Sequence, residues 1–165
     1  MNNTSYSSFE LISSTFADGG PIPSEYTCDG SSGLSPALSI IGTPTETRSL
    51  VLIMDDPDIP QAVKDARGID VFDHWVLFNI PPGTKEILEG DSVGTPGANS
   101  AGQNTYAAPC PPVQYEPSEH RYVFTLYALD EELPLKIGAS KHNVLAAVQG
   151  HIIAQAQITG RYKRK

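Results

Sequence analysis

The sequence has 165 residues with 39% hydrophobic side chains, enough for one domain with a buried core. Its 14 glycines and 14 prolines make it loop-rich, which is more typical of β proteins than of helix bundles. The net charge of −8 argues against binding to nucleic acid or to anionic membrane surfaces. Four of the 11 basic side chains lie in the last five residues, and we interpret this short basic end as solvated.

No targeting signal is visible in the sequence. Residues 1–5 carry no basic side chain, and neither an apolar leader segment nor a bilayer-spanning apolar stretch follows. We therefore expect a soluble cytoplasmic protein. In that compartment Cys28 and Cys110 are expected to be two reduced thiols. If they pair instead, the long loop would contribute roughly 4–5 kcal/mol in the chain-entropy treatment.

The predicted elements are mostly strands. In chain order, apolar and β-branched segments predict strands at 9–12 (with 15–16), 36–41, 49–54, 72–80, 120–129 and 152–160. Ser140 and Gly150 bracket a predicted helix at 141–149. Residues 61–70 form either a helical turn or a surface loop, and 90–106 is a long irregular segment of the functional or mobile kind. With about seven strands and no internal repeat, residues 1–165 are expected to form a single, mainly β (α+β) domain. Its strands are expected to be mostly antiparallel, and two packed sheets are one arrangement that would accommodate them.

The central strand is expected at Leu50–Met54, an unbroken apolar run. Pro57 and Pro60 lack amide donors, so the strand cannot continue past them within a sheet. Three carboxylates therefore emerge where the strand leaves the core: Asp55, Asp56 and Asp58. Buried carboxylates need partners, so this strand end should face a cleft, a cation or protonated histidines.

Two other predicted strands place titratable groups at their ends, at His74-Trp75 and at His120-Arg121-Tyr122. Side chains alternate along a strand, so His120 and Tyr122 share one face and Arg121 points to the other. Each residue also has a structural interpretation. Asp56 could cap the turn that Pro57 begins, and His74 and Tyr122 could be packing residues of half-buried strands. We interpret His142 and His151, which flank the predicted helix, as structural.

Four kinds of site remain open for this cluster. A metal site would use Asp56, Asp58, His74 and His120, although no short His-x-His or His-x₃-His spacing occurs. A Ser–His–Asp hydrolase would need a nucleophile elbow, and no G-x-S-x-G is present. A glycosidase pair of Asp56 and Asp58 is too closely spaced in sequence to flank a sugar. The fourth is an anion pocket, in which His74, His120, Tyr122 and a loop amide donate hydrogen bonds and Asp56 orients a histidine.

Several ordered motifs together resemble the phosphatidylethanolamine-binding protein family, specifically its bacterial and archaeal Raf-kinase-inhibitor-like (YbhB/YbcL) branch. They are D-P-D-x-P at 56–60, H-W at 74–75 running to N-I-P at 79–81, and G-x-N-S-x-G at 97–102. Y-x-x-P-C-P-P at 106–112, H-R-Y at 120–122 and T-C-D-G at 27–30 with Ser35-Pro36 complete the pattern, which covers almost the whole chain.

The resemblance implies a large central antiparallel sheet, a smaller second sheet, peripheral short helices and a small cavity for phosphate-like anions. It implies that the cavity is lined by Asp56, Pro60, His74, Ala108, Cys110, Pro111, Pro112, His120 and Tyr122. It also makes a homodimer plausible. Two departures stand out: Ala107-Ala108 replaces the two glycines common in the branch, and the C-terminal helix of mammalian members has no counterpart. Alanine resists positive φ, so we do not transfer the loop's backbone contact to a ligand. Because the helix that borders the pocket in mammalian members has no counterpart, we do not transfer lipid binding or Raf-kinase inhibition either.

We therefore predict a non-enzymatic binding module, without cofactor or metal, that holds a small phosphorylated or carboxylated ligand. The alternative is a protein-interaction regulator, such as a kinase or protease inhibitor, that uses the pocket rim and the 90–106 segment. A metal-dependent or hydrolytic enzyme is the third. Among the three carboxylates, we expect Asp56 in the pocket, Asp58 to brace the turn, and Asp55 to be solvated or paired locally.

Overall fold

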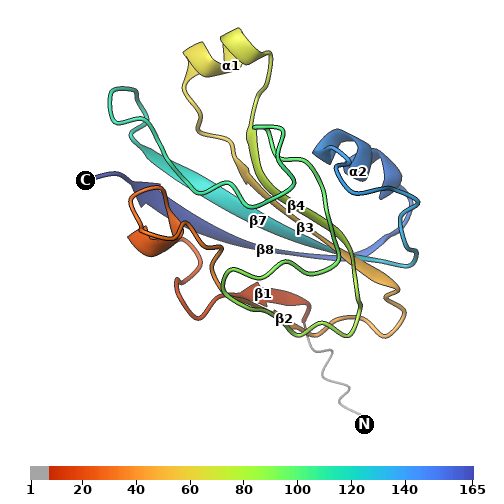
Figure 1. The fold of residues 1–165 in the computed structure, drawn as a ribbon. Helices are drawn as coiled ribbons and strands as arrows, with labels where there is room; N and C mark the ends of the chain where they lie inside the picture. Colours follow the sequence, from red (N-terminus) through yellow and green to blue (C-terminus); the bar gives the residue numbers. More distant parts are fainter. Residues whose placement is uncertain (1–7) are drawn as a thin grey trace.

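The computed structural model describes residues 8–165 as two antiparallel sheets with short helices at the periphery (Figure 1). The larger sheet has the order β6-β4-β3-β7-β8, and the smaller one has the order β1-β2-β5. The strands are β1 (Glu10–Ile12), β2 (Leu38–Ile41), β3 (Ser49–Asp56), β4 (Phe72–Ile80), β5 (Glu86–Ile87), β6 (Thr95–Pro96), β7 (Glu119–Leu129) and β8 (Ile152–Lys163). The helices are α1 (Gln61–Arg67) and α2 (Lys141–Ala147), with a 3₁₀ turn η1 at Ser24–Tyr26.

Strand β3 lies at the centre of the larger sheet and is buried on both faces. Leu50, Leu52 and Met54 face the smaller sheet and join the main core. Val51 and Ile53 face the other way, into a second cluster that includes side chains of α2. This two-sided burial explains the unbroken apolar run, because each fully buried large side chain contributes about 1.5–3 kcal/mol.

The expected mainly β fold with a large and a small antiparallel sheet is confirmed, with differences in detail. The described residues form eight strands rather than about seven. The short strand β6 lies in the segment predicted as irregular, and β5 lies where no element was predicted. Strand β3 continues through Asp56 instead of ending at Met54, because both additional carboxylates have partners. Residues 61–67 form a helix, which resolves the two alternatives for that segment.

Cys28 and Cys110 form a disulfide, so the expectation of two reduced thiols is wrong. The backbone around them is also paired, since the Cys28 N–H donates to the Pro109 carbonyl at 3.0 Å. Disulfides are typical of oxidising compartments and rare in the cytosol, so this one does not support the cytoplasmic location expected from the sequence. The expectation of no leader rests on residues 1–5, which lie outside the described residues. None of the described helices is long and apolar enough to cross a bilayer.

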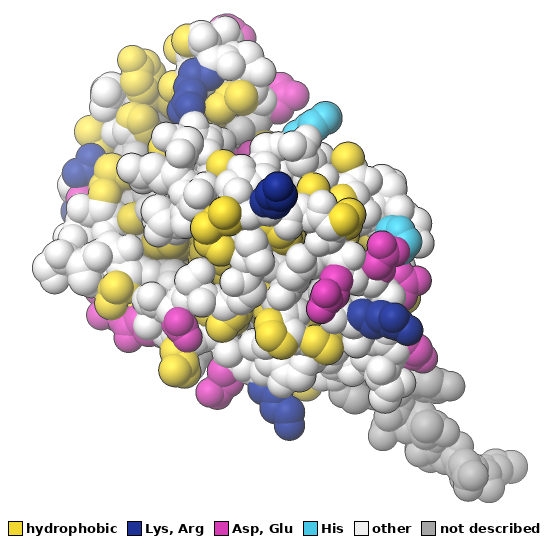
Figure 2. Space-filling view, turned by 45° about the vertical axis from the view of Figure 1, so that its right-hand side comes forward, with side chains coloured by type: hydrophobic (Ala, Val, Ile, Leu, Met, Phe, Trp, Pro, Cys, Tyr) yellow, Lys and Arg dark blue, Asp and Glu magenta, His cyan; other side chains and the backbone are white. Residues whose placement is uncertain are grey.

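The segment predicted as irregular at 90–106 is ordered internally by Asn99, which is buried. The side chain of Asn99 donates to the Thr105 carbonyl at 2.9 Å and accepts from the N–H groups of Ala101 and Gln103. Ser100 then joins the segment to the start of β4, because its N–H donates to the Asp73 carbonyl at 2.9 Å. On the face shown in Figure 2, Lys and Arg side chains are scattered rather than gathered into one patch.

Candidate functional site

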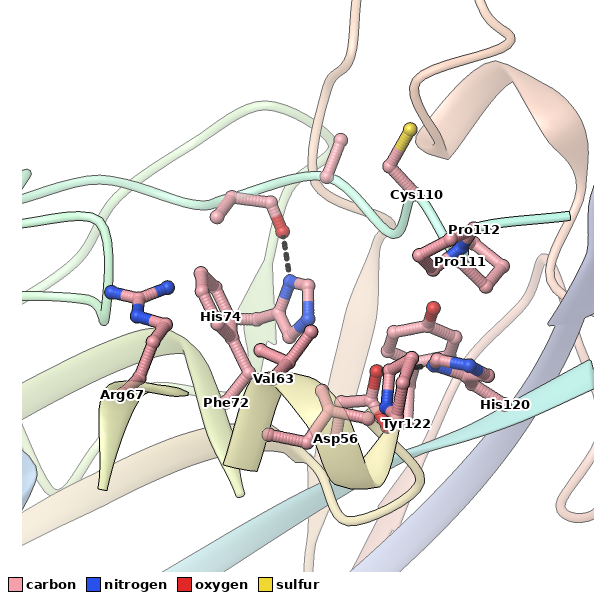
Figure 3. A pocket seen from close by; sticks show the side chains of 14 residues that line it. Asp56, Val63, Arg67, Phe72, His74, Cys110, Pro111, Pro112, His120 and Tyr122 are labelled. Carbon is pink, nitrogen blue, oxygen red and sulfur yellow. Dashed lines mark hydrogen bonds and ion pairs between the residues drawn. The ribbon is translucent and has the colours of Figure 1, made fainter. Parts of the chain in front are cut away.

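A cavity of about 230 Å³ lies where β3, β4 and β7 end beside α1 (Figure 3). All nine residues predicted from the resemblance line it: Asp56, Pro60, His74, Ala108, Cys110, Pro111, Pro112, His120 and Tyr122. Five further residues also line it: Ile59, Val63, Arg67, Phe72 and Ala107. The structure thus brings the predicted set together, and its role in binding stays a prediction.

A buried, hydrogen-bonded pair of side chains forms the floor of the cavity. His120 Nδ1 lies 2.7 Å from Oδ2 of Asp56, and the two side chains are only 1% and 3% exposed. A carboxylate only accepts, so Nδ1 carries the proton of this bond. The other oxygen of Asp56 accepts from the Asp58 N–H at 2.7 Å. Asp56 therefore caps the turn and orients the histidine at the same time, which unites the two interpretations of its role.

The remaining nitrogen of His120, Nε2, is buried and has no hydrogen-bond partner among the described residues. An unsatisfied buried polar atom costs about 1–3 kcal/mol, so natural structures seldom retain one without a use. A neutral His120 would present a lone pair at Nε2, whereas a protonated one would present a donor.

A β-bulge in β4 directs His74 into the cavity. Trp75 lies opposite Met54 and Asp73 lies opposite Asp55, so His74 is an extra residue with no partner on β3. Strict alternation would place His74 and Trp75 on opposite faces, but a bulge changes the direction of a side chain. As a result Trp75 packs in the core between the sheets while its neighbour His74 lines the cavity.

The ring of His74 is fixed by the cavity wall. Its Nδ1 lies 2.6 Å from the Ala107 carbonyl, and the Ala107 N–H donates back to the His74 carbonyl at 2.8 Å. A carbonyl only accepts, so Nδ1 is protonated here as well. Burial lowers the pKa of His74, although the Ala107 carbonyl and the charge of Asp56 partly oppose this effect. Nε2 of His74 is consequently a lone-pair acceptor at neutral pH.

This lowered pKa predicts a stability change on mild acidification. The folded chain favours neutral His74, so the associated stability is present above the unfolded pKa near 6.5 and is lost as pH falls through the lower folded pKa. We expect the free energy of unfolding to decrease below about pH 6.5. Urea unfolding at a series of pH values measures it. The variant His74→Gln should flatten this part of the profile, and a similar slope in both proteins would contradict the assignment.

Tyr122 lies between the two histidines. Its ring stacks on that of His120, with centroids 6.3 Å apart, and meets the ring of His74 edge-on at 5.2 Å. Burial, followed by the charge of Asp56, raises the pKa of Tyr122 well above its ordinary value near 10. The phenol therefore keeps its proton and can donate a hydrogen bond.

Arg121 points away from the cavity, which confirms the alternation predicted for 120–122. Its guanidinium donates to both oxygens of Asp58, at 2.9 and 2.8 Å, and its backbone N–H adds a third bond. These contacts lower the pKa of Asp58. Asp58 thus braces the turn as predicted, and it does not join Asp56, His74 and His120 in the arrangement that the metal alternative required.

Asp55, the third carboxylate at the end of β3, is paired on the opposite face of the sheet. Lys141 of α2 lies 3.3 Å from Asp55 and 2.6 Å from Asp73. Burial raises the pKa of Asp55, and the nearby lysine opposes this shift. Of the two histidines interpreted as structural, His151 pairs with Asp130 and Glu131 at the exposed far end of β7 and β8.

Helix α1 contributes two side chains to the cavity that were not predicted from the sequence. Val63 and Arg67 stand four residues apart, the spacing that places side chains on one face of a helix, and both line the cavity. Pro60 precedes the helix, so the D-P-D-x-P motif leads directly into it. The spacing of Val63 and Arg67 is visible in the sequence, but a helix was only one of the two structures predicted for 61–70.

Ala107 and Ala108, which replace two glycines common in the branch, adopt ordinary backbone conformations without strain. Among the described residues, Asn79 alone of the non-glycines has positive φ.

Comparison with known proteins gives a consistent result. The family model described as phosphatidylethanolamine-binding protein matches residues 12–163. A UPF0098 protein of Methanothermobacter thermautotrophicus is 45% identical over 161 residues, covering 93% of this chain and 98% of that protein. A UPF0098 protein of Chlamydia trachomatis is 41% identical over 156 residues, covering 94% and 99%.

Two solved structures are similar. A phosphatidylethanolamine-binding protein homolog from Chlamydia trachomatis is 40% identical, with a TM-score of 0.88 over 96% of this chain and 99% of that one. Escherichia coli YbcL, described as a member of the mammalian family, shares the fold at 24% identity, with a TM-score of 0.81 over 95% and 99%. With its motifs, its two sheets and this match over nearly its whole length, the chain belongs to the phosphatidylethanolamine-binding protein family.

Proposed function

We propose that this chain is a non-enzymatic binding protein that holds a small phosphate-like or carboxylate anion in the cavity. The observation that carries the proposal is the buried, unpartnered Nε2 of His120, in a cavity that His74 and Tyr122 also line. These three side chains come from two strands and converge on one small volume. A protonated imidazole and a phenol are the kinds of donor that bind oxyanions.

Binding should be coupled to proton uptake. In both histidines the Nδ1 proton is already bonded to the protein, to Asp56 in one case and to the Ala107 carbonyl in the other. Each Nε2 therefore donates to an anion only when its ring is protonated. The anion supplies the counter-charge that a buried imidazolium needs, so anion and proton stabilise one another. Tyr122 adds a donor that does not depend on this step.

The composition of the lining supports binding rather than hydrolysis. No serine or threonine is among the described residues that line the cavity, and the sulfur of Cys110 is held in a disulfide. Both oxygens of Asp56 already accept hydrogen bonds from the protein. Among the described lining residues there is thus no activated nucleophile beside a free general base, which covalent hydrolytic mechanisms need.

An NMR titration with inorganic phosphate tests the proposal. We expect the ring signals of His74 and His120 to shift, with larger shifts at pH 6 than at pH 8. The variant His120→Asn keeps a donor for Asp56 but removes Nε2, and it should weaken binding about tenfold or more, the worth of a charge-assisted hydrogen bond. Arg121→Ala, on the neighbouring residue and the opposite face, is the matched control and should change the affinity less than about twofold. Unmoved histidine signals, or a larger effect of Arg121→Ala, would exclude this pocket as the binding site.

A further inference from the structure

We propose that Arg67 binds a second anionic group at the mouth of the cavity, so that the preferred ligands are small molecules with two acidic groups. This inference rests on the proposed function and specifies the class of ligand. It assigns a role to a side chain that the family resemblance did not include.

Arg67 is held in place beside the cavity although its side chain is exposed. One guanidinium nitrogen donates to the Ser100 carbonyl at 2.5 Å. The guanidinium carbon lies 5.3 Å from the centroid of the Phe72 ring, within the range of a cation–π contact. A cation positioned in this way loses less conformational entropy when it binds a ligand than a freely rotating one.

The charge of Arg67 is not neutralised within the described chain. Among the described residues, no carboxylate lies within ion-pair distance of it. Six other basic side chains also lack an acidic partner there, and what sets Arg67 apart is its position at the cavity. Arg67 is also the single lysine or arginine among the described residues that line the cavity. The remaining N–H groups of its guanidinium form a fork suited to a carboxylate or phosphate.

The positions of Arg67 and His74 on either side of Phe72 indicate the size of the ligand. The Phe72 ring lies 5.3 Å from the Arg67 guanidinium and 4.8 Å from the His74 ring, so one aromatic ring stands between the two polar groups. Figure 3 shows the side chains of Arg67, Phe72 and His74 side by side in this order. A ligand that reaches both must carry two acidic groups on a short apolar spacer, which would pass over Phe72 and Val63.

The test compares matched ligands by calorimetry. Phosphonocarboxylates from 3-phosphonopropionate to 5-phosphonopentanoate carry two acidic groups, and the alkylphosphonates of equal chain length carry one. With the unmodified chain, we expect at least one phosphonocarboxylate to bind about tenfold more tightly than its alkylphosphonate, since each tenfold is about 1.4 kcal/mol. Arg67→Gln should abolish this preference, so that each phosphonocarboxylate binds this variant no more tightly than its alkylphosphonate.

Lys64→Gln provides the control for net charge. Lys64 lies on the same helix but does not line the cavity, so this variant should keep the preference. Equal binding of both ligand types by the unmodified chain, or a preference that persists in Arg67→Gln, would overturn the inference and leave the proposed function standing. If phosphate and all phosphonates fail to bind, the proposed function and this inference both fail.

Discussion

Replacing both cysteines, Cys28→Ser with Cys110→Ser, is expected to lower the free energy of unfolding by about 4–5 kcal/mol. The two residues are separated by 82 positions, so the disulfide closes a loop that spans about half of the chain. In the chain-entropy treatment, a cross-link stabilises a fold by restricting the unfolded state, and the effect grows with loop length. A loss of this size is a large part of the stability of a typical domain. Equilibrium unfolding in guanidinium chloride measures it.

A reductant provides the control, because the chain has two cysteines in all. Dithiothreitol should lower the stability of the unmodified chain to that of the double variant, and it should leave the double variant unchanged. A difference of less than about 1 kcal/mol between the oxidised and reduced chains would show that the cross-link contributes little.

The variant Asp56→Ala is expected to destabilise the fold by about 2–4 kcal/mol, because it leaves a buried hydrogen-bond donor without an acceptor and removes a side-chain cap. Asp56 and His120 are almost fully buried and 2.7 Å apart, so the lone histidine would retain no acceptor for Nδ1. The same substitution removes the hydrogen bond to the Asp58 N–H and thus loosens the turn. Chemical unfolding at neutral pH gives the free energy.

Arg121→Ala is the matched control for this second prediction. It removes an ion pair on the neighbouring residue of β7, but the arginine side chain is 58% exposed. Exposed pairs contribute about 0–1 kcal/mol, so the control should cost far less than Asp56→Ala. Equal losses of unfolding free energy in the two variants would contradict the expectation that the buried pair of Asp56 and His120 stabilises the fold more than the exposed pair of Asp58 and Arg121.

Both large effects concern contacts that shape the cavity, one in its wall at 107–112 and one in its floor. One end of this wall is fixed by the reciprocal hydrogen bonds between His74 and Ala107. The other end is fixed by the disulfide at Cys110, followed by two prolines that restrict the backbone. The floor beneath it is the pair of Asp56 and His120. The cavity is therefore shaped by contacts that link five separate parts of the chain, which keeps its donors in position before a ligand arrives.

The sequence by itself determined the features that depend on local patterns. The apolar run before Asp56 identified the central strand, because burial on both faces requires a continuous apolar stretch. Alternation along β7 placed His120 and Tyr122 on one face and Arg121 on the other, since the side-chain period of a strand is two. The family resemblance carried by the ordered motifs identified nine of the 14 described residues that line the cavity, as well as the arrangement of a large and a small sheet.

The tertiary structure alone decided the features that depend on register and on long-range contact. The direction of His74 follows from a bulge, which exists only in the pairing of β4 with β3. The disulfide depends on two loops meeting in space, and the unpaired charge of Arg67 depends on where α1 sits against Phe72 and Ser100. Asp56 serves both the turn and His120 because β7 lies beside β3, 64 positions away in sequence. Such relations arise from packing between distant segments, which the local period of a sequence does not encode.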